Sequence, residues 1–138
     1  NHLRGPIKAY SKACYTDVGG LRVALGWDTL DELLALQRGY QVKIDKELLV
    51  KHLRLTGAKY NYKGAVTKGR LFYELGYGFF LGVLASIKWS LNQRGSLLAA
   101  LGGFLGAWFT SKPKLVTKQE ARFITRYRWS QIFSRFIS

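Results

Sequence analysis

Hydrophobic residues gather in two neighbouring stretches in the second half of the chain, and each stretch predicts a helix. The first covers residues 71–87 and the second residues 96–110, with the eight residues KWSLNQRG between them. Small residues recur at four-residue spacing in both stretches, and residues four apart lie on the same side of a helix. A face without bulky side chains lets a neighbouring backbone approach closely. The small residues predicted to lie at helix contacts are Gly78, Gly82, Ser86, Gly95, Ala99, Gly102, Gly103, Gly106 and Ala107.

The two stretches together indicate a transmembrane helical hairpin. Charged residues stop abruptly at their ends, and aromatic residues cluster there, as they do at a bilayer surface. A membrane span needs about 20 mostly apolar residues, with roughly 17 as the lower limit, and both stretches lie at or below that limit. Two alternatives therefore stay open. One is a pair of buried helices in the core of a soluble protein, and the other is a single span with a second helix in the membrane interface.

The rest of the chain predicts further helices, so the expected fold class is mainly α. Residues 1–26 predict an extended basic arm, and residues 27–39 and 45–57 predict two short helices that form a small helical hairpin. Thr117 and Glu120 have the spacing of a capping box at the start of a last helix. The three expected regions are a basic arm with its small hairpin (1–69), the transmembrane hairpin (70–111), and a basic amphipathic C-terminal helix (112–138).

The charge is strongly positive, and its distribution suggests an anionic ligand. The chain has 22 Lys and Arg against 8 Asp and Glu, a net charge of +14. Anionic lipid headgroups and nucleic acid both fit such a surface, and the adjacent apolar stretches favour lipid. Cardiolipin is the expected bound phospholipid, and nucleic acid is the second choice. The basic residues predicted to contact headgroups are Lys63, Lys68, Arg70, Lys112, Lys114, Arg122 and Arg126.

No pattern in the sequence indicates catalysis, a cofactor or a metal site. His2 and His52 are the only histidines, Cys14 is the only cysteine, and none of them has the spacing of metal ligands. Glu74 is the one acid inside a predicted span, where an ionisable residue is a functional candidate by default. Arg70 lies one helical turn before it, so an ion pair at the membrane boundary is the expected role of Glu74.

The start of the chain suggests a processed, imported protein. The chain contains no methionine and begins with Asn1 and His2. We expect that a targeting segment has been removed, as organelle transit peptides are. A chain start that is missing from the sequence would leave the same pattern. Basic residues flank both outer ends of the predicted hairpin, and the positive-inside rule then places both termini in the mitochondrial matrix and the hairpin in the inner membrane.

These features are similar in general form to the accessory subunits of respiratory-chain complexes and of the ATP synthase membrane region. The pairs Gly78–Gly82 and Gly102–Gly106 resemble the glycine-patterned subunits of ATP synthase. The resemblance implies a non-catalytic subunit that braces neighbouring subunits of an electron-transport or ATP synthase complex and binds lipid. Two other hypotheses stay open. One is a mitochondrial ribosomal or other RNA-associated structural protein with a buried glycine-rich helix pair, and the other is a translocation or pore component.

Overall fold

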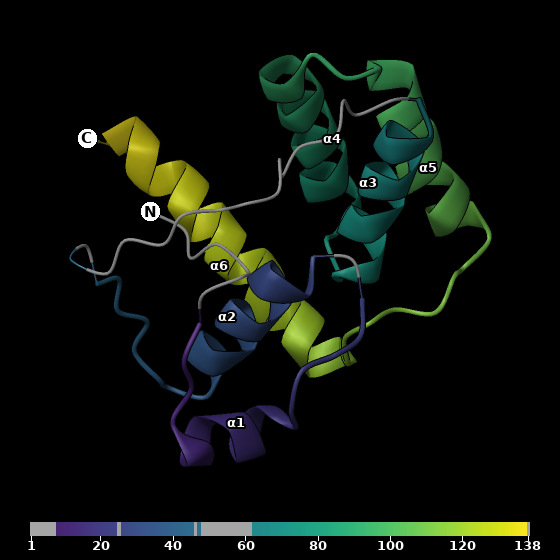
Figure 1. Cartoon of the computed structure of the whole chain (residues 1–138). Helices are drawn as coiled ribbons and strands as arrows, with labels where there is room; N and C mark the ends of the chain where they lie inside the picture. Colours follow the sequence, from purple (N-terminus) through teal and green to yellow (C-terminus); the bar gives the residue numbers. More distant parts are fainter. Residues whose placement is uncertain (1–7, 25, 46, 48–61, 138) are drawn as a thin grey trace. The chain divides into compact units, whose positions relative to one another are not determined.

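The computed structural model describes residues 8–24, 26–45, 47 and 62–137, with side chains as far as residue 134. Helices make up most of the described chain (Figure 1). The chain divides into an N-terminal unit, Asn1–Thr56, and a C-terminal unit, Gly57–Ser138. The helices are α1 (Lys12–Val18), α2 (Trp27–Gln37), α3 (Tyr62–Glu74), α4 (Phe79–Gln93), α5 (Leu97–Phe109) and α6 (Lys118–Ile137).

The N-terminal unit contains α1 and α2, which pack against each other. The segment predicted to be an extended arm includes a helix, because Ser11 caps α1 by accepting a hydrogen bond from the Cys14 N–H. Gly19 ends that helix with a left-handed φ of 81°. The predicted helix over 27–39 corresponds to α2, and its N-cap is Gly26. The predicted helix over 45–57 lies mostly outside the described residues.

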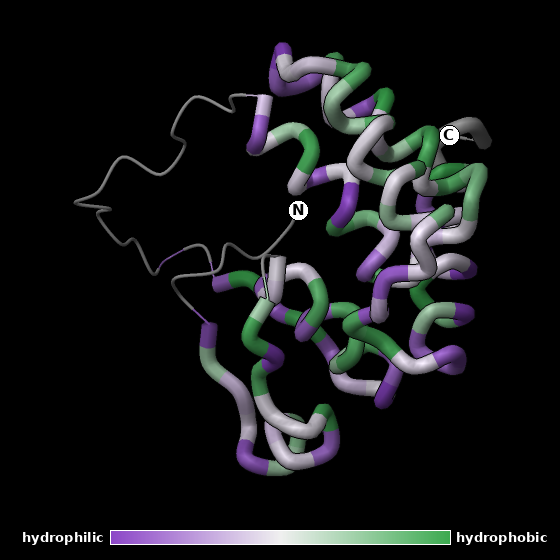
Figure 2. Tube along the Cα trace, turned by 90° about the vertical axis from the view of Figure 1, so that its right-hand side faces the viewer, coloured by the Kyte–Doolittle hydropathy of each residue, from purple (hydrophilic) through white to green (hydrophobic). Residues whose placement is uncertain are grey.

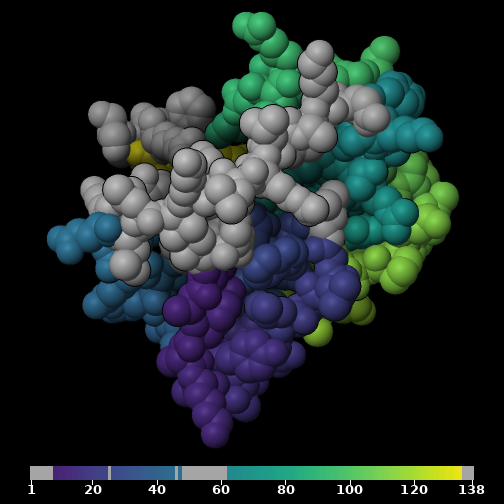
Figure 3. Space-filling view, in the orientation of Figure 1, coloured from purple at the N-terminus to yellow at the C-terminus, as the bar shows by residue number. Residues whose placement is uncertain are grey.

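The C-terminal unit is built on three helices, with α5 packed against both α3 and α4. Figure 3 shows the teal atoms of α3 in direct contact with the green atoms of α5 and the segment after it. The side of α5 that faces the core carries Ala99, Ala100, Gly103, Phe104 and Ala107, which are all buried. Figure 2 shows hydrophobic and hydrophilic positions mixed along the helices.

The first apolar stretch is not one helix, because the chain reverses within it. Residue Gly76 takes a left-handed φ of 78°, and α3 ends just before it. The Gly76 N–H donates to the Tyr73 carbonyl (2.9 Å) and the Tyr77 N–H to the Phe72 carbonyl (3.1 Å). This pair of bonds is the Schellman motif that closes helix C-termini. The chain then enters α4 with Gly78 as the N-cap. Residues 71–87 are therefore shared between two helices.

The prediction of a transmembrane hairpin is wrong, because the helices formed by the two apolar stretches are too short to span a bilayer. The helices α4 and α5 contain 15 and 13 residues. At 1.5 Å per residue they measure roughly 20 Å, and the apolar part of a bilayer is about 30 Å thick. Within the described residues, no helix combines the length and the apolar character that a membrane span requires. The predicted inner-membrane location, with both termini in the matrix, depended on that hairpin and is contradicted with it. Nothing found supports the mitochondrial assignment.

Candidate functional site

One of the predicted small residues, Gly103, lies at a close crossing of α3 and α5. A Cβ atom added to Gly103 would lie 2.0 Å from the carbonyl oxygen of Val66 in α3. From the other side, a Cβ atom added to Gly69 would lie 1.8 Å from the carbonyl oxygen of Ala100. The prediction did not include Gly69, although the sequence places two small residues, Ala65 and Gly69, at the same four-residue spacing. The two backbones are therefore in direct contact at glycine positions.

The other predicted contact residues have different surroundings. A Cβ atom on Gly82 would lie 2.1 Å from the ring of Phe104, and Ser86 is fully buried with its hydroxyl donating to the Gly82 carbonyl (2.8 Å). Gly102 and Gly106 lie on the exposed side of α5, where an added Cβ atom would meet nothing within 4 Å. The remaining members are Gly78 at the N-cap of α4, Gly95 against the Trp89 ring, and Ala99 and Ala107 on the buried side of α5.

Glu74 does not lie inside a membrane span, because it is the last residue of α3. Its carboxylate oxygen Oε1 accepts a hydrogen bond from Arg70 Nε at 2.5 Å, in the i,i+4 relation. Its backbone carbonyl accepts a hydrogen bond from the N–H of Leu115 (2.9 Å). The backbone of Glu74 thus joins the end of α3 to the segment that leads into α6, while its carboxylate pairs with Arg70 of the same helix.

Most of the predicted headgroup-binding residues are exposed cations of the C-terminal unit. Lys63, Arg70, Lys112, Lys114, Arg122 and Arg126 are exposed, and Lys68 is half-buried. Lys114 Nζ lies 5.0 Å from the ring centre of Tyr73 and 5.9 Å from that of Trp108. Cations over aromatic rings at such distances are attracted by the ring quadrupole. The aromatic edge of the bundle thus holds Lys114 beside the start of α6.

Helix α6 begins as the sequence predicts. The Thr117 N–H donates to Glu120 Oε2 (2.7 Å), and the Glu120 N–H donates to Thr117 Oγ1 (3.3 Å), which completes a capping box. Further along, Thr125 Oγ1 donates to the carbonyl of Gly76 (3.2 Å). A Cβ atom added to Gly76 would lie 2.5 Å from the Ala121 side chain, so α6 passes very close to the turn between α3 and α4.

Three cations line a hollow where α6 passes that turn. Lys114, Arg122 and Arg126 border a space of about 380 Å³ together with the turn residues Gly76 and Gly78, and we call it the basic hollow. Among the described residues, neither Arg122 nor Arg126 forms an ion pair. Gly78 has no side chain to cap the first N–H groups of α4. The basic hollow is therefore electropositive and suited to an anion.

A second hollow lies further along the same face of α6. It has a volume of about 560 Å³ and is lined by Arg126, Trp129, Ser130 and Phe133, and we call it the aromatic hollow. The rings of Trp129 and Phe133 stack with their centres 5.7 Å apart and their planes 25° apart. Phe133 remains 57% exposed. Arg126 borders both hollows, so charged and aromatic groups are continuous along this face.

The C-terminal unit has far more cations than carboxylates. Residues 62–134 contain eleven Lys and Arg, and their only carboxylates are Glu74 and Glu120. Both carboxylates hold local structure, since Glu74 pairs with Arg70 and Glu120 caps α6. Two carboxylates cannot neutralise eleven cations, so the described surface of this unit is strongly basic.

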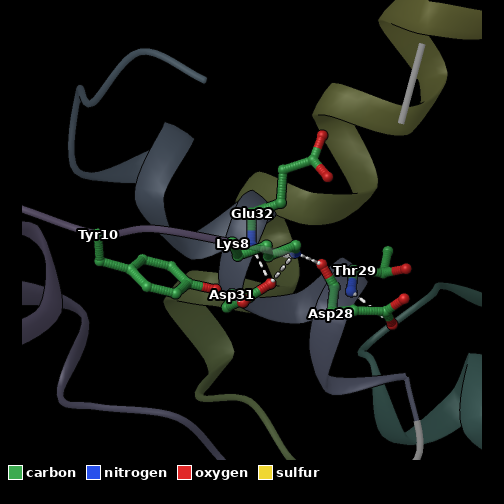
Figure 4. A network of polar contacts seen from close by, with 6 residues as sticks. All are labelled: Lys8, Tyr10, Asp28, Thr29, Asp31 and Glu32. Carbon is green, nitrogen blue, oxygen red and sulfur yellow. Dashed lines mark hydrogen bonds and ion pairs between the residues drawn. The ribbon is translucent and has the colours of Figure 1, made fainter. Parts of the chain in front are cut away.

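Polar groups of the N-terminal unit are bound to one another. Lys8 Nζ donates to Asp31 Oδ1 at 2.8 Å, with both side chains only 4% exposed, and to the Asp28 carbonyl (Figure 4). Tyr10 donates its hydroxyl to Asp31 Oδ2 from the other side. Burial, and then the hydrogen bond to Asp31, raise the pKa of Tyr10 above its usual value. Burial likewise raises the pKa of the Cys14 thiol, which disfavours the reactive thiolate.

The described residues contain no group of three or more His, Cys, Asp or Glu side chains placed to hold a metal ion. No family model, curated protein or solved structure matches this chain. The basic hollow and the aromatic hollow together give α6 a face that carries both cations and aromatic rings.

Proposed function

We propose that this chain is a non-catalytic structural protein that binds RNA through its basic C-terminal unit. The observation that carries the proposal is the charge balance of residues 62–134, where eleven cations face two carboxylates that are both engaged in local structure. Lys and Arg that neutralise phosphates release condensed counterions, and this supplies most of the affinity of proteins for nucleic acids.

Further support comes from the way charged and aromatic groups alternate on α6. Arg122 and Arg126 are exposed, and the stacked pairs Phe123–Tyr127 and Trp129–Phe133 have ring centres 6.0 Å and 5.7 Å apart. Proteins that bind single-stranded nucleic acid combine a positive groove with aromatic rings on which bases stack. The close glycine contact between α3 and α5 holds these helices together, and α6 passes close to the turn between α3 and α4.

The experiment that tests the proposal measures how binding of a labelled RNA depends on salt. Fluorescence anisotropy with the full chain is recorded at several salt concentrations between 50 and 200 mM. We expect the logarithm of the association constant to fall linearly with the logarithm of the salt concentration, with a slope near −0.7 per phosphate contacted. Poly-glutamate of equal charge serves as the comparison. Absence of RNA binding would contradict the proposal. Equal binding to RNA and to poly-glutamate would also contradict it and would favour an acidic protein partner.

The second candidate is a structural subunit that packs against other proteins of an assembly. It is favoured by large apolar side chains exposed on α4 and α5, since extended apolar surface marks interaction sites. Those more than 70% exposed are Phe80, Leu91, Leu98 and Phe109. Self-association or aggregation of the purified chain that Leu98→Ser and Phe109→Ser relieve would favour this candidate. A monodisperse monomer that binds RNA would argue against it.

A further inference from the structure

We infer that the exposed face of α6 takes a single-stranded RNA segment, with a backbone phosphate in the basic hollow and a base stacked in the aromatic hollow. The inference rests on the proposed function and names the kind of RNA and the residues that receive it. A basic surface by itself binds single strands and duplexes alike, whereas a surface that also stacks a base prefers single-stranded RNA.

The phosphate position follows from three cations that converge from two segments. Lys114 comes from the segment before α6, and Arg122 and Arg126 come from successive turns of the helix. Because Arg122 and Arg126 form no ion pair among the described residues, their donors are available to a ligand. A guanidinium group can donate two parallel hydrogen bonds to two oxygen atoms of one phosphate. The hydroxyl of Thr125 already donates its hydrogen to the Gly76 carbonyl, so the anion is bound mainly by the three cations.

The base position follows from the stacked pair in the aromatic hollow. Phe133 covers one side of Trp129 and is itself 57% exposed, so one aromatic face is open to a ligand. The bases of a duplex already have both faces covered by neighbouring base pairs, whereas unpaired bases can stack on a protein side chain. An exposed aromatic face beside cations therefore discriminates in favour of a single strand.

The spacing along α6 connects the two positions. Arg122, Arg126, Trp129 and Phe133 follow one another at intervals of four, three and four residues, so they share one face of the helix. From the first to the last of them the helix rises about 16 Å. That length accommodates a few nucleotides, and Arg126, which borders both hollows, lies where a phosphate would join the stacked base to its neighbour.

The test compares two RNAs and two pairs of matched variants in the full chain. The RNAs are a ten-nucleotide oligouridine and a ten-base-pair duplex, and the readout is fluorescence anisotropy. Arg122→Gln with Arg126→Gln is matched by Lys88→Gln with Arg94→Gln, which removes the same charge from exposed positions around α4. Phe133→Leu is matched by Phe109→Leu, which alters another exposed aromatic residue. Thermal unfolding followed by circular dichroism establishes that each variant is folded.

We expect Phe133→Leu to weaken oligouridine binding by about 5-fold or more, as loss of one base stack does, and to leave duplex binding unchanged. The double arginine variant should reduce the magnitude of the oligouridine salt slope by about 1.4, and its lysine–arginine control by much less. Equal losses for the test and control variants, with salt-dependent RNA binding intact, would overturn this inference and leave the proposed function standing. Failure of the parent chain to bind either RNA would overturn both.

Discussion

Replacing Gly103 by alanine tests the close crossing of α3 and α5. The new Cβ atom would lie 2.0 Å from the Val66 carbonyl oxygen and 2.8 Å from its carbonyl carbon. Non-bonded heavy atoms settle near 3.5 Å, so the two helices would have to separate by about 1 Å or more. The neighbour is backbone and not a flexible side chain, which means that no rotamer change can relieve the contact.

The magnitude combines two opposing effects. Overpacking a core typically costs about 1–3 kcal/mol, and we take about 3 kcal/mol because the obstacle is backbone. Alanine in place of glycine within a helix returns about 1 kcal/mol of propensity. The net expectation is a loss of about 2 kcal/mol in the free energy of unfolding. For a domain of this size, that corresponds to a fall in Tm on the order of 10 °C.

The matched control lies one residue away on the same helix. An added Cβ atom on Gly102 would meet nothing within 4 Å, so Gly102→Ala should stabilise the protein by about 1 kcal/mol through propensity alone. Urea unfolding followed by circular dichroism should therefore separate the two variants by about 3 kcal/mol. If Gly103→Ala proves as stable as Gly102→Ala, α3 and α5 do not cross as closely as described and the reasoning is refuted.

Three further predictions concern the N-terminal unit. Lys8→Met should destabilise it by about 3 kcal/mol in chemical unfolding, because it leaves Asp31 buried without its cation, whereas Lys12→Met, at an exposed position, should have little effect. The raised pKa of Tyr10 means that the folded state holds this proton more tightly than the unfolded state does. Its stabilisation is therefore complete below about pH 10 and is lost as the pH rises further, and Tyr10→Phe should make the alkaline fall in unfolding free energy shallower. Cys14 is 7% exposed and its pKa is raised, so its reaction with a thiol reagent at pH 8 should be many-fold slower in buffer than in denaturant, and equal rates would contradict its burial.

The parts of the fold that were predicted correctly are those that local chemistry determines. The stretch 96–110 predicted a helix, and α5 spans Leu97–Phe109. The Thr117 and Glu120 pair predicted a capping box, and both hydrogen bonds are present. In each case neighbouring residues supply the interactions that decide the structure, so their order in the sequence carries the information.

The hairpin was predicted wrongly because hydrophobicity does not report backbone conformation. Residues 71–87 contain no charged side chain except Glu74, yet Gly76 ends one helix inside them. The basic hollow was not predicted either, although Lys114, Arg122 and Arg126 were each identified as candidate anion contacts. They come together because α6 passes close to the turn at Gly76, and that arrangement depends on tertiary packing.

The left-handed glycine at position 76 sets the direction in which the chain leaves α3. Without it, residues 62–93 could continue as one rod of roughly 48 Å, and α4 would no longer return along α3. A bulkier residue at that position would carry a backbone penalty of about 1–2 kcal/mol and would also collide with Ala121, 2.5 Å from the added atom. The missing side chain at position 76 therefore favours the reversal of the chain between α3 and α4, and it leaves room for α6 to bring its cations to the turn.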